Sequence, residues 1–78
     1  MKNENEISRS VRRTVEGYLK DLDGEDPSGI YDMVMNSIEK PLLELVLHHA
    51  EGNQTRAAEM LGINRNTLRK KMQAYRIK

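Results

Sequence analysis

The last 27 residues of the chain carry seven basic side chains and a single acidic one, Glu59. This segment has a net charge of +6, whereas residues 1–51 carry six basic and eleven acidic side chains and a net charge of −5. An acidic body with a basic end suits a protein that presents one face to a polyanion such as nucleic acid. A solvated basic tail is the simpler alternative, and the residue pattern inside the segment must decide between the two.

The basic residues lie in a pattern of two short helices separated by Gly62. Glycine adopts the positive φ of such a break at little cost, while Asn53 and Asn64 can each cap the helix that follows. Ala58 lets the two helices cross closely, and four apolar residues supply a shared core: Leu61, Ile63, Leu68 and Met72. This layout is typical of a helix-turn-helix. Because its second helix is also the basic one, we predict that residues 52–78 bind double-stranded DNA.

The predicted contacts follow from the way such a helix enters the major groove. Asn64, Arg65 and Thr67 lie at its N-terminal turn, where side chains reach base edges and flanking phosphates. The planar fork of Arg65 fits guanine bidentately. Long cations one turn further on can reach phosphates on the groove walls; these are Arg69, Lys70 and Lys71. Asn53 and Thr55 begin the first helix, whose free N–H groups favour a phosphate.

Other interpretations of these residues stay open. Asn53 can act as a helix cap, as a phosphate ligand, or as both, and Lys70 and Lys71 can simply complement the negative end of the helix dipole. Neighbouring residues on a helix point about 100° apart, so His48 and His49 cannot bind one metal together. Since no phosphate loop, metal-ligand set or activated nucleophile is recognisable, we predict no enzyme, no cofactor, no metal and no small-molecule substrate.

Two longer helices must position this unit. The first is predicted from a stripe at steps of three and four: Ile7, Val11, Val15, Tyr18, Leu19 and Leu22. Gly24 is expected just past its end. Asp26 can cap a second helix with Pro27 at its first position. Residues 1–6 are polar and are expected to form a disordered tail.

The second helix, up to about residue 50, is apolar on nearly every side and must therefore be buried nearly all round. One stripe consists of Ile30, Val34, Ile38, Leu42, Leu45 and Val46. A single amphipathic partner cannot cover such a helix, so we predict that a second copy of the chain does, with this stripe as the dimer core. Pro41 removes one backbone donor, which leaves open one kinked helix or two short ones. Gly52 is expected just past the C-terminus.

Length and composition also favour an oligomer. With 78 residues and no Cys, Phe or Trp, the chain has few large side chains and no disulfide with which to stabilise a core of its own. No apolar signal region opens the sequence, and no stretch is long enough to cross a bilayer. We expect a soluble cytoplasmic protein with no membrane partner.

The residues from Gly52 to Ala58, continuing through Gly62–Arg65 and Thr67–Lys71, closely resemble the Fis (factor for inversion stimulation) family of bacterial nucleoid-associated DNA-binding proteins. The likeness extends back through Pro41 and Ile30 and covers most of the chain from about Val11. It is shared with the Fis-like C-terminal domain of NtrC-type activators, whose ATPase module this chain does not contain.

The resemblance implies an all-α subunit of four helices with a C-terminal helix-turn-helix. Residues 7–51, with the second helix kinked at Pro41, would form an intertwined homodimer. It further implies a transcriptional regulator that binds and bends DNA in the nucleoid, with RNA polymerase as a possible protein partner. In Fis the two recognition helices lie too close for straight DNA, so the duplex bends and A·T-rich centres are favoured without contact. By position, the family's DNA contacts fall on Asn53, Thr55, Asn64, Arg65, Thr67, Arg69 and Lys70.

Three departures from enteric Fis bear on function. We expect this chain to lack the β-hairpin arm that activates DNA invertases, because it begins too late, and this argues against recombinase stimulation. Glu51 stands where enteric Fis has an arginine, and Gln73 and Ala74 replace lysines, which predicts weaker wrapping and a shallower salt dependence. Two alternatives remain: a local repressor of narrow specificity, and a helical dimerisation or adaptor module whose basic face binds an acidic protein.

Overall fold

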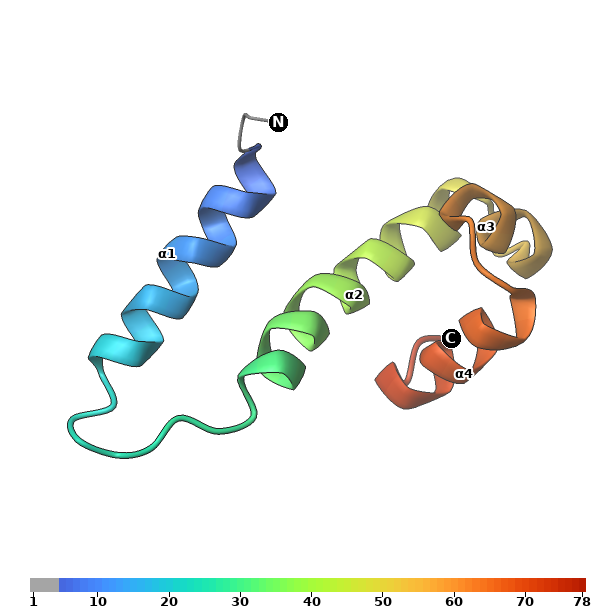
Figure 1. Ribbon diagram of the computed structural model, residues 1–78. Helices are drawn as coiled ribbons and strands as arrows, with labels where there is room; N and C mark the ends of the chain where they lie inside the picture. Colours follow the sequence, from blue (N-terminus) through green and yellow to red (C-terminus); the bar gives the residue numbers. More distant parts are fainter. Residues whose placement is uncertain (1–4) are drawn as a thin grey trace. The chain divides into compact units, whose positions relative to one another are not determined.

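The computed structural model describes residues 5–78 (Figure 1). Within them the chain forms four helices and no strand, which confirms the all-α fold: α1 (Glu6–Lys20), α2 (Ile30–His49), α3 (Gln54–Leu61) and α4 (Arg65–Tyr75). The chain divides into two compact units, one up to residue 35 and one over residues 36–78, so α2 begins in the first and ends in the second. No helix among the described residues is long and apolar enough to span a membrane.

α1 begins at Glu6 because Asn5 caps it, its side-chain oxygen accepting a hydrogen bond from the N–H of Ser8 at 2.9 Å. The helix therefore starts inside the tail predicted for residues 1–6, of which residues 1–4 lie outside the described residues. α1 has an apolar stripe but buries none of its residues, and the side chain of Ile7 is 63% exposed. The other residues of the stripe are exposed or only partly buried.

The start of α2 differs from the sequence prediction. Residues 25–28 are not helical, and α2 begins at Ile30 rather than at Pro27. Gly29 has a φ of +67°, a left-handed conformation that no right-handed helix contains, so the helix can begin only after it. The Asp26-Pro27 pair therefore lies in the connecting segment and is not a helix cap.

α2 then continues through Pro41 as one helix, which excludes the alternative of two short helices. The position just past the C-terminus of α2 lies one residue before the predicted Gly52. Glu51, with a φ of +57°, donates its N–H to the carbonyl of His48, and the N–H of Gly52 donates to the carbonyl of Leu47 at 2.9 Å. This pair of bonds closes a helix in a Schellman motif, so the position just past the end belongs to Glu51 and Gly52 follows it.

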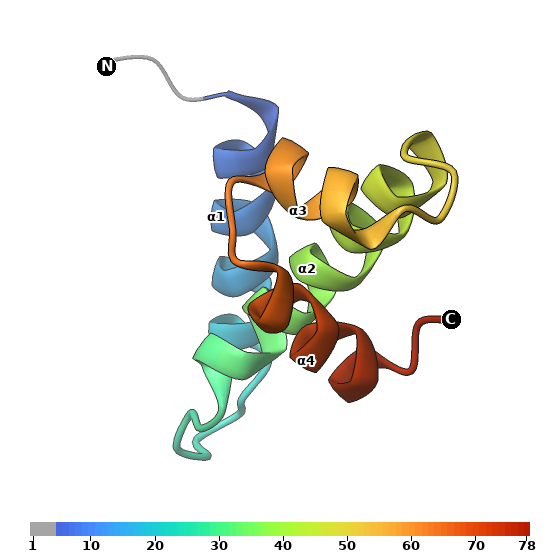
Figure 2. The same cartoon turned by 90° about the vertical axis from the view of Figure 1, so that its right-hand side faces the viewer.

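In the second unit, α3 and α4 pack against the C-terminal half of α2 (Figure 1, Figure 2). Seven residues are buried there: Leu43, Leu47, Ala50, Ala57, Ala58, Leu68 and Met72. Two of the three alanines, Ala57 and Ala58, belong to α3, where small side chains let the neighbouring helices approach closely. Leu61 and Ile63 pack partly buried against this core, so the residues that the sequence assigned to the helix-turn-helix core all lie in it or against it.

The stripe of α2 predicted as a dimer core is less buried than the helix-turn-helix core. None of its six members is buried in the described chain, and Leu42 and Leu45 are 45% and 69% exposed. The residues of α2 buried against the helix-turn-helix are instead Leu43 and Leu47, and Val46 is the one member of the stripe that packs, partly buried, against the same core. α2 thus divides its apolar side chains between a covered face and an uncovered one.

Leu68 tests the core of the second unit because its side chain is completely inaccessible. Leu68→Ala should lower the free energy of unfolding by about 2–5 kcal/mol, since it removes buried methyl groups and leaves a cavity. Thr67→Ala, at the exposed neighbouring position, should change it by less than about 0.5 kcal/mol. Chemical denaturation of both variants provides the comparison, and equal losses would contradict the packing of α4 described above.

Candidate nucleic-acid interface

The turn between α3 and α4 forms as the sequence predicts. The side-chain oxygen of Asn53 accepts from the N–H of Arg56 at 3.1 Å and caps α3. Gly62, at a φ of +75°, ends α3 and donates to the carbonyls of Ala58 and Glu59. The side-chain oxygen of Asn64 then accepts from the N–H of Asn66 at 2.7 Å and caps α4. These local bonds fix where each short helix begins and ends.

Packing then decides which face of α4 meets solvent. Leu68 and Met72 are buried beneath the helix, and the predicted contact residues of its other sides are exposed: Asn64, Arg65, Thr67, Arg69 and Lys70. Five of the predicted contact residues are therefore accessible to a ligand from solvent. No acidic residue follows Glu59 in the chain, so no carboxylate of α4 offsets this charge.

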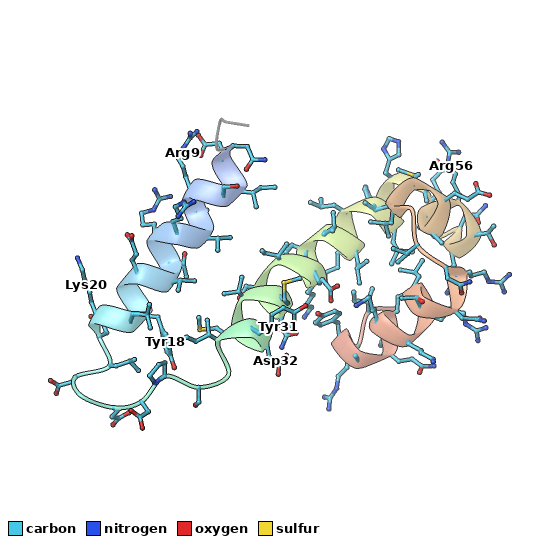
Figure 3. The ribbon with its side chains drawn as sticks, viewed as in Figure 1. Arg9, Tyr18, Lys20, Tyr31, Asp32 and Arg56 are labelled. Atoms are coloured by element: carbon cyan, nitrogen blue, oxygen red, sulfur yellow. The ribbon has the colours of Figure 1, made fainter. Side chains whose placement is uncertain are left out.

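The start of α3 adds further polar groups near this surface. Asn53 and Thr55 are both exposed, and Arg56 extends from α3 into solvent (Figure 3). Gln54, the first residue of α3, lines a shallow hollow of about 270 Å³ together with Arg69 and Gln73 of α4. The positive end of the α3 dipole thus lies beside the basic face of α4.

Lys71 is separated from the other predicted contacts. Its ammonium nitrogen lies 2.9 Å from a carboxylate oxygen of Glu39 on α2, and its side chain is partly covered rather than fully exposed. The ion pair gives Lys71 a structural partner that neither charge nor local spacing indicated. A role for Lys71 in binding phosphate stays a prediction.

The same carboxylate accepts a hydrogen bond from the hydroxyl of Tyr75, which also lies 3.1 Å from the side-chain oxygen of Asn36. These bonds connect α2 to α4. The hydroxyl of Tyr75 and then the ammonium of Lys71 stabilise the charged carboxylate, so the pKa of Glu39 lies below its ordinary value of 4.5. Sequence reasoning missed both Glu39 and Tyr75, because partners more than 30 residues apart leave no local pattern.

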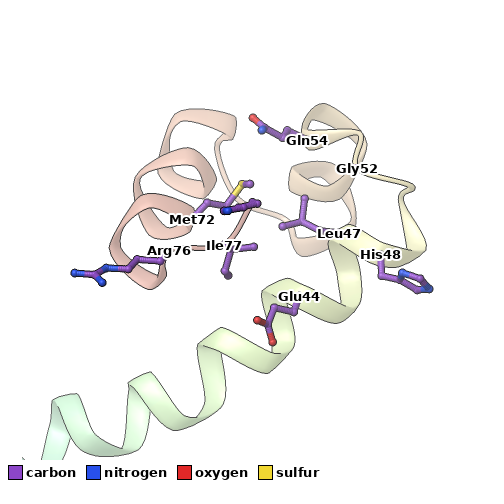
Figure 4. A pocket seen from close by; sticks show the side chains of 9 residues that line it. Glu44, Leu47, His48, Gly52, Gln54, Met72, Arg76 and Ile77 are labelled. Carbon is purple, nitrogen blue, oxygen red and sulfur yellow. The ribbon is translucent and has the colours of Figure 1, made fainter.

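A larger hollow lies between α2, the start of α3 and the C-terminus. It has a volume of about 460 Å³ (Figure 4) and is lined by Glu44, Leu47, His48, Gly52, Gln54, Met72, Arg76, Ile77 and Lys78. The residues that the structure describes contain no cluster of three or more His, Cys, Asp or Glu able to hold a metal ion.

Comparison with known proteins gives a consistent assignment. Residues 35–75 match the family described as bacterial regulatory protein, Fis family. The chain is 56% identical over 71 residues to a putative Fis-like DNA-binding protein of Ralstonia nicotianae, covering 91% of this chain and 92% of that one. It is 52% identical over 69 residues to DNA-binding protein Fis of Glaesserella parasuis, covering 88% and 70%. A putative Fis-like DNA-binding protein of Neisseria meningitidis is 54% identical over 67 residues, with 86% and 85% covered.

The link from α2 to α4 predicts a pH-dependent contribution to stability. Glu39→Gln should lower the free energy of unfolding at neutral pH by about 1 kcal/mol, because it removes an ion pair and weakens a hydrogen bond. Since the folded pKa lies below the unfolded one, this contribution is complete above pH 4.5 and is lost as the pH falls through the lowered pKa. The variant should therefore lose less stability on acidification than the parent.

Thermal melting between pH 7 and pH 3 measures both effects. Glu44→Gln is the matched control, because Glu44 is an exposed carboxylate on the same helix. A double-mutant cycle with Lys71→Met should show coupling with Glu39→Gln and none with Glu44→Gln. Identical acid profiles for the Glu39 variant and the parent would exclude the described link.

Proposed function

The chain belongs to the Fis family of bacterial regulatory proteins, and from that premise we propose that it binds double-stranded DNA through the exposed face of α4. Members of this family are DNA-binding regulators and not enzymes. The observation that carries the proposal is the combination of two buried residues, Leu68 and Met72, with three exposed cations on the same helix, Arg65, Arg69 and Lys70.

Each side chain of this surface has a distinct part in the proposal. Arg65 stands at the first position of α4, where its guanidinium can pair with the acceptors of guanine in the major groove. Thr67 serves a base edge or a neighbouring phosphate. Arg69 and Lys70 lie one turn further on and contact phosphates, which position the helix without reading sequence.

The two caps support a combined role for Asn53 and Asn64. In both residues the side-chain oxygen accepts a hydrogen bond from a backbone N–H, and the residue is exposed, so its side-chain NH₂ group is not needed for the cap. A phosphate oxygen accepts hydrogen bonds, and the side-chain NH₂ group of each asparagine is a donor that the cap does not use. Capping and phosphate contact are therefore compatible, and Thr55 at the start of α3 adds a hydroxyl donor beside the helix dipole.

We propose further that the protein acts as a homodimer, with residues 7–51 forming the subunit interface and residues 52–78 the DNA-binding part. The uncovered apolar residues of α1 and α2 support this, since surfaces of this kind mark interaction sites. The proposal includes three further properties on family membership alone. These are bending of the duplex, localisation to the cytoplasm and nucleoid, and contact with RNA polymerase. An adaptor that binds an acidic protein is the competing function, and DNA binding at low salt separates the two.

Arg65→Ala should reduce specific DNA affinity by about 1–3 kcal/mol, because it removes a bidentate base contact. Fluorescence anisotropy on a palindromic duplex with an A·T-rich centre gives the measurement. Lys20→Ala, at the exposed end of α1, is the charge-matched control and should leave affinity unchanged. Equal effects of the two substitutions would remove Arg65 from the site, and failure of the parent to bind any duplex at low salt would favour the adaptor.

Leu45→Glu should convert the dimer to monomers, since it places a charge on the most exposed residue of the proposed interface stripe. Sedimentation gives the mass, and melting of the parent should shift upward with protein concentration. Met60→Glu is the control, because Met60 is an exposed apolar residue of α3 outside the stripe. A monomeric parent whose melting temperature does not depend on concentration would contradict the proposed dimer.

A further inference from the structure

The exposed face of α4 contains two amide side chains outside the set of contacts described so far. Asn66 and Gln73 line a shallow hollow of about 260 Å³ together with Arg69 and Lys70. All four residues are exposed. A ligand that binds Arg69 and Lys70 in this hollow would therefore also lie beside the amides of Asn66 and Gln73.

The position of Asn66 follows from the roll of α4 about its own axis. Each residue of an α-helix turns by about 100°, so Arg65 and Thr67 stand about 100° to either side of Asn66. Leu68 and Met72 lie on the opposite side and are buried. Asn66 is thus close to the centre of the exposed face, whereas the base contacts proposed above project from its flanks.

The position of Asn66 along α4 also favours contact with base edges. Asn66 is the second residue of α4, and the N-terminal turn of a recognition helix reaches furthest into the major groove. Gln73 follows seven residues later, about 10 Å further along the axis, where a helix that enters at an angle approaches the sugar–phosphate wall. The two amides therefore meet different parts of a duplex.

The chemistry of Asn66 differs from that of its cationic neighbours. Its backbone N–H is used by the Asn64 cap, but its side chain has no hydrogen-bond partner among residues 5–78, which leaves one donor and one acceptor available. Adenine offers a matching pair in the major groove, the N7 acceptor and the N6 amino donor, and asparagine binds them bidentately. Arginine and lysine are donors only and cannot make that pair.

We propose that Asn66 is a specificity-determining residue that reads an adenine in each half-site, while Gln73 makes a contact with the duplex backbone that carries no sequence information. This inference rests on the proposed DNA binding and deepens it. It adds a base-reading position at the centre of α4 to the one proposed for Arg65.

Selection of binding sites from a randomised duplex pool tests the assignment. Asn66→Ala should abolish an adenine preference at one position of each half-site and lower affinity for the best site about tenfold. The slope of affinity against salt should stay unchanged, because no charge is removed. Asn66→Arg should change the preferred base at that position to guanine. Gln73→Ala is the matched amide control and should leave all base preferences intact.

A duplex with 7-deazaadenine at the identified position, which lacks the N7 acceptor, completes a double-mutant cycle. The modified base should weaken binding of the parent severalfold and have no effect on Asn66→Ala, and melting curves should show that the variant stays folded. If Asn66→Ala keeps every base preference of a parent that binds DNA, the assignment of Asn66 is wrong and the proposed function stands. If the parent selects no duplex at low salt, both are wrong.

Discussion

The burial of one side of α4 is the constraint on which the candidate interface depends. Leu68 and Met72 sit in a core shared with Leu43 and Leu47 of α2 and with two alanines of α3. Removing these side chains from water fixes the rotation of α4 about its axis, because other rotations would bury a cation or a polar side chain without a partner. The direction in which Arg65, Arg69 and Lys70 point is therefore a consequence of apolar packing and needs no interaction among the charges themselves.

The helix-turn-helix could be predicted because its signals are local. Asn53, Gly62 and Asn64 each act on backbone groups within four residues, so their types and spacing alone indicated the two helices. The errors arose where a local signal had two meanings. Asp26-Pro27 suits a helix start and a turn equally well, and the positive φ of Gly29 decided the matter. At the end of α2, Glu51 took the left-handed position that glycine usually occupies.

The partnership of Glu39 with Lys71 and Tyr75 could not be predicted for a different reason. It joins residues whose proximity exists only after α4 has packed against α2. In the sequence, Lys71 is one cation in a cluster, and nothing distinguishes it from Lys70. The structure separates them: Lys70 is exposed on the outer face, while Lys71 turns toward α2. Charge counts alone therefore overstate how many cations of a basic helix are available to a polyanion.

α1 buries none of its residues, and under the proposed dimer this has a consequence for the cell. In a newly synthesised chain the apolar stripe of α1 would stay in contact with water until the chain dimerised. The concentration of the active dimer would therefore rise with roughly the square of the chain concentration while that concentration is low. Doubling synthesis would then raise occupancy of weak chromosomal sites by more than twofold. Because α1 depends on dimerisation, any change in expression level, for example through gene dosage or growth rate, would change regulation. No small-molecule effector would be needed.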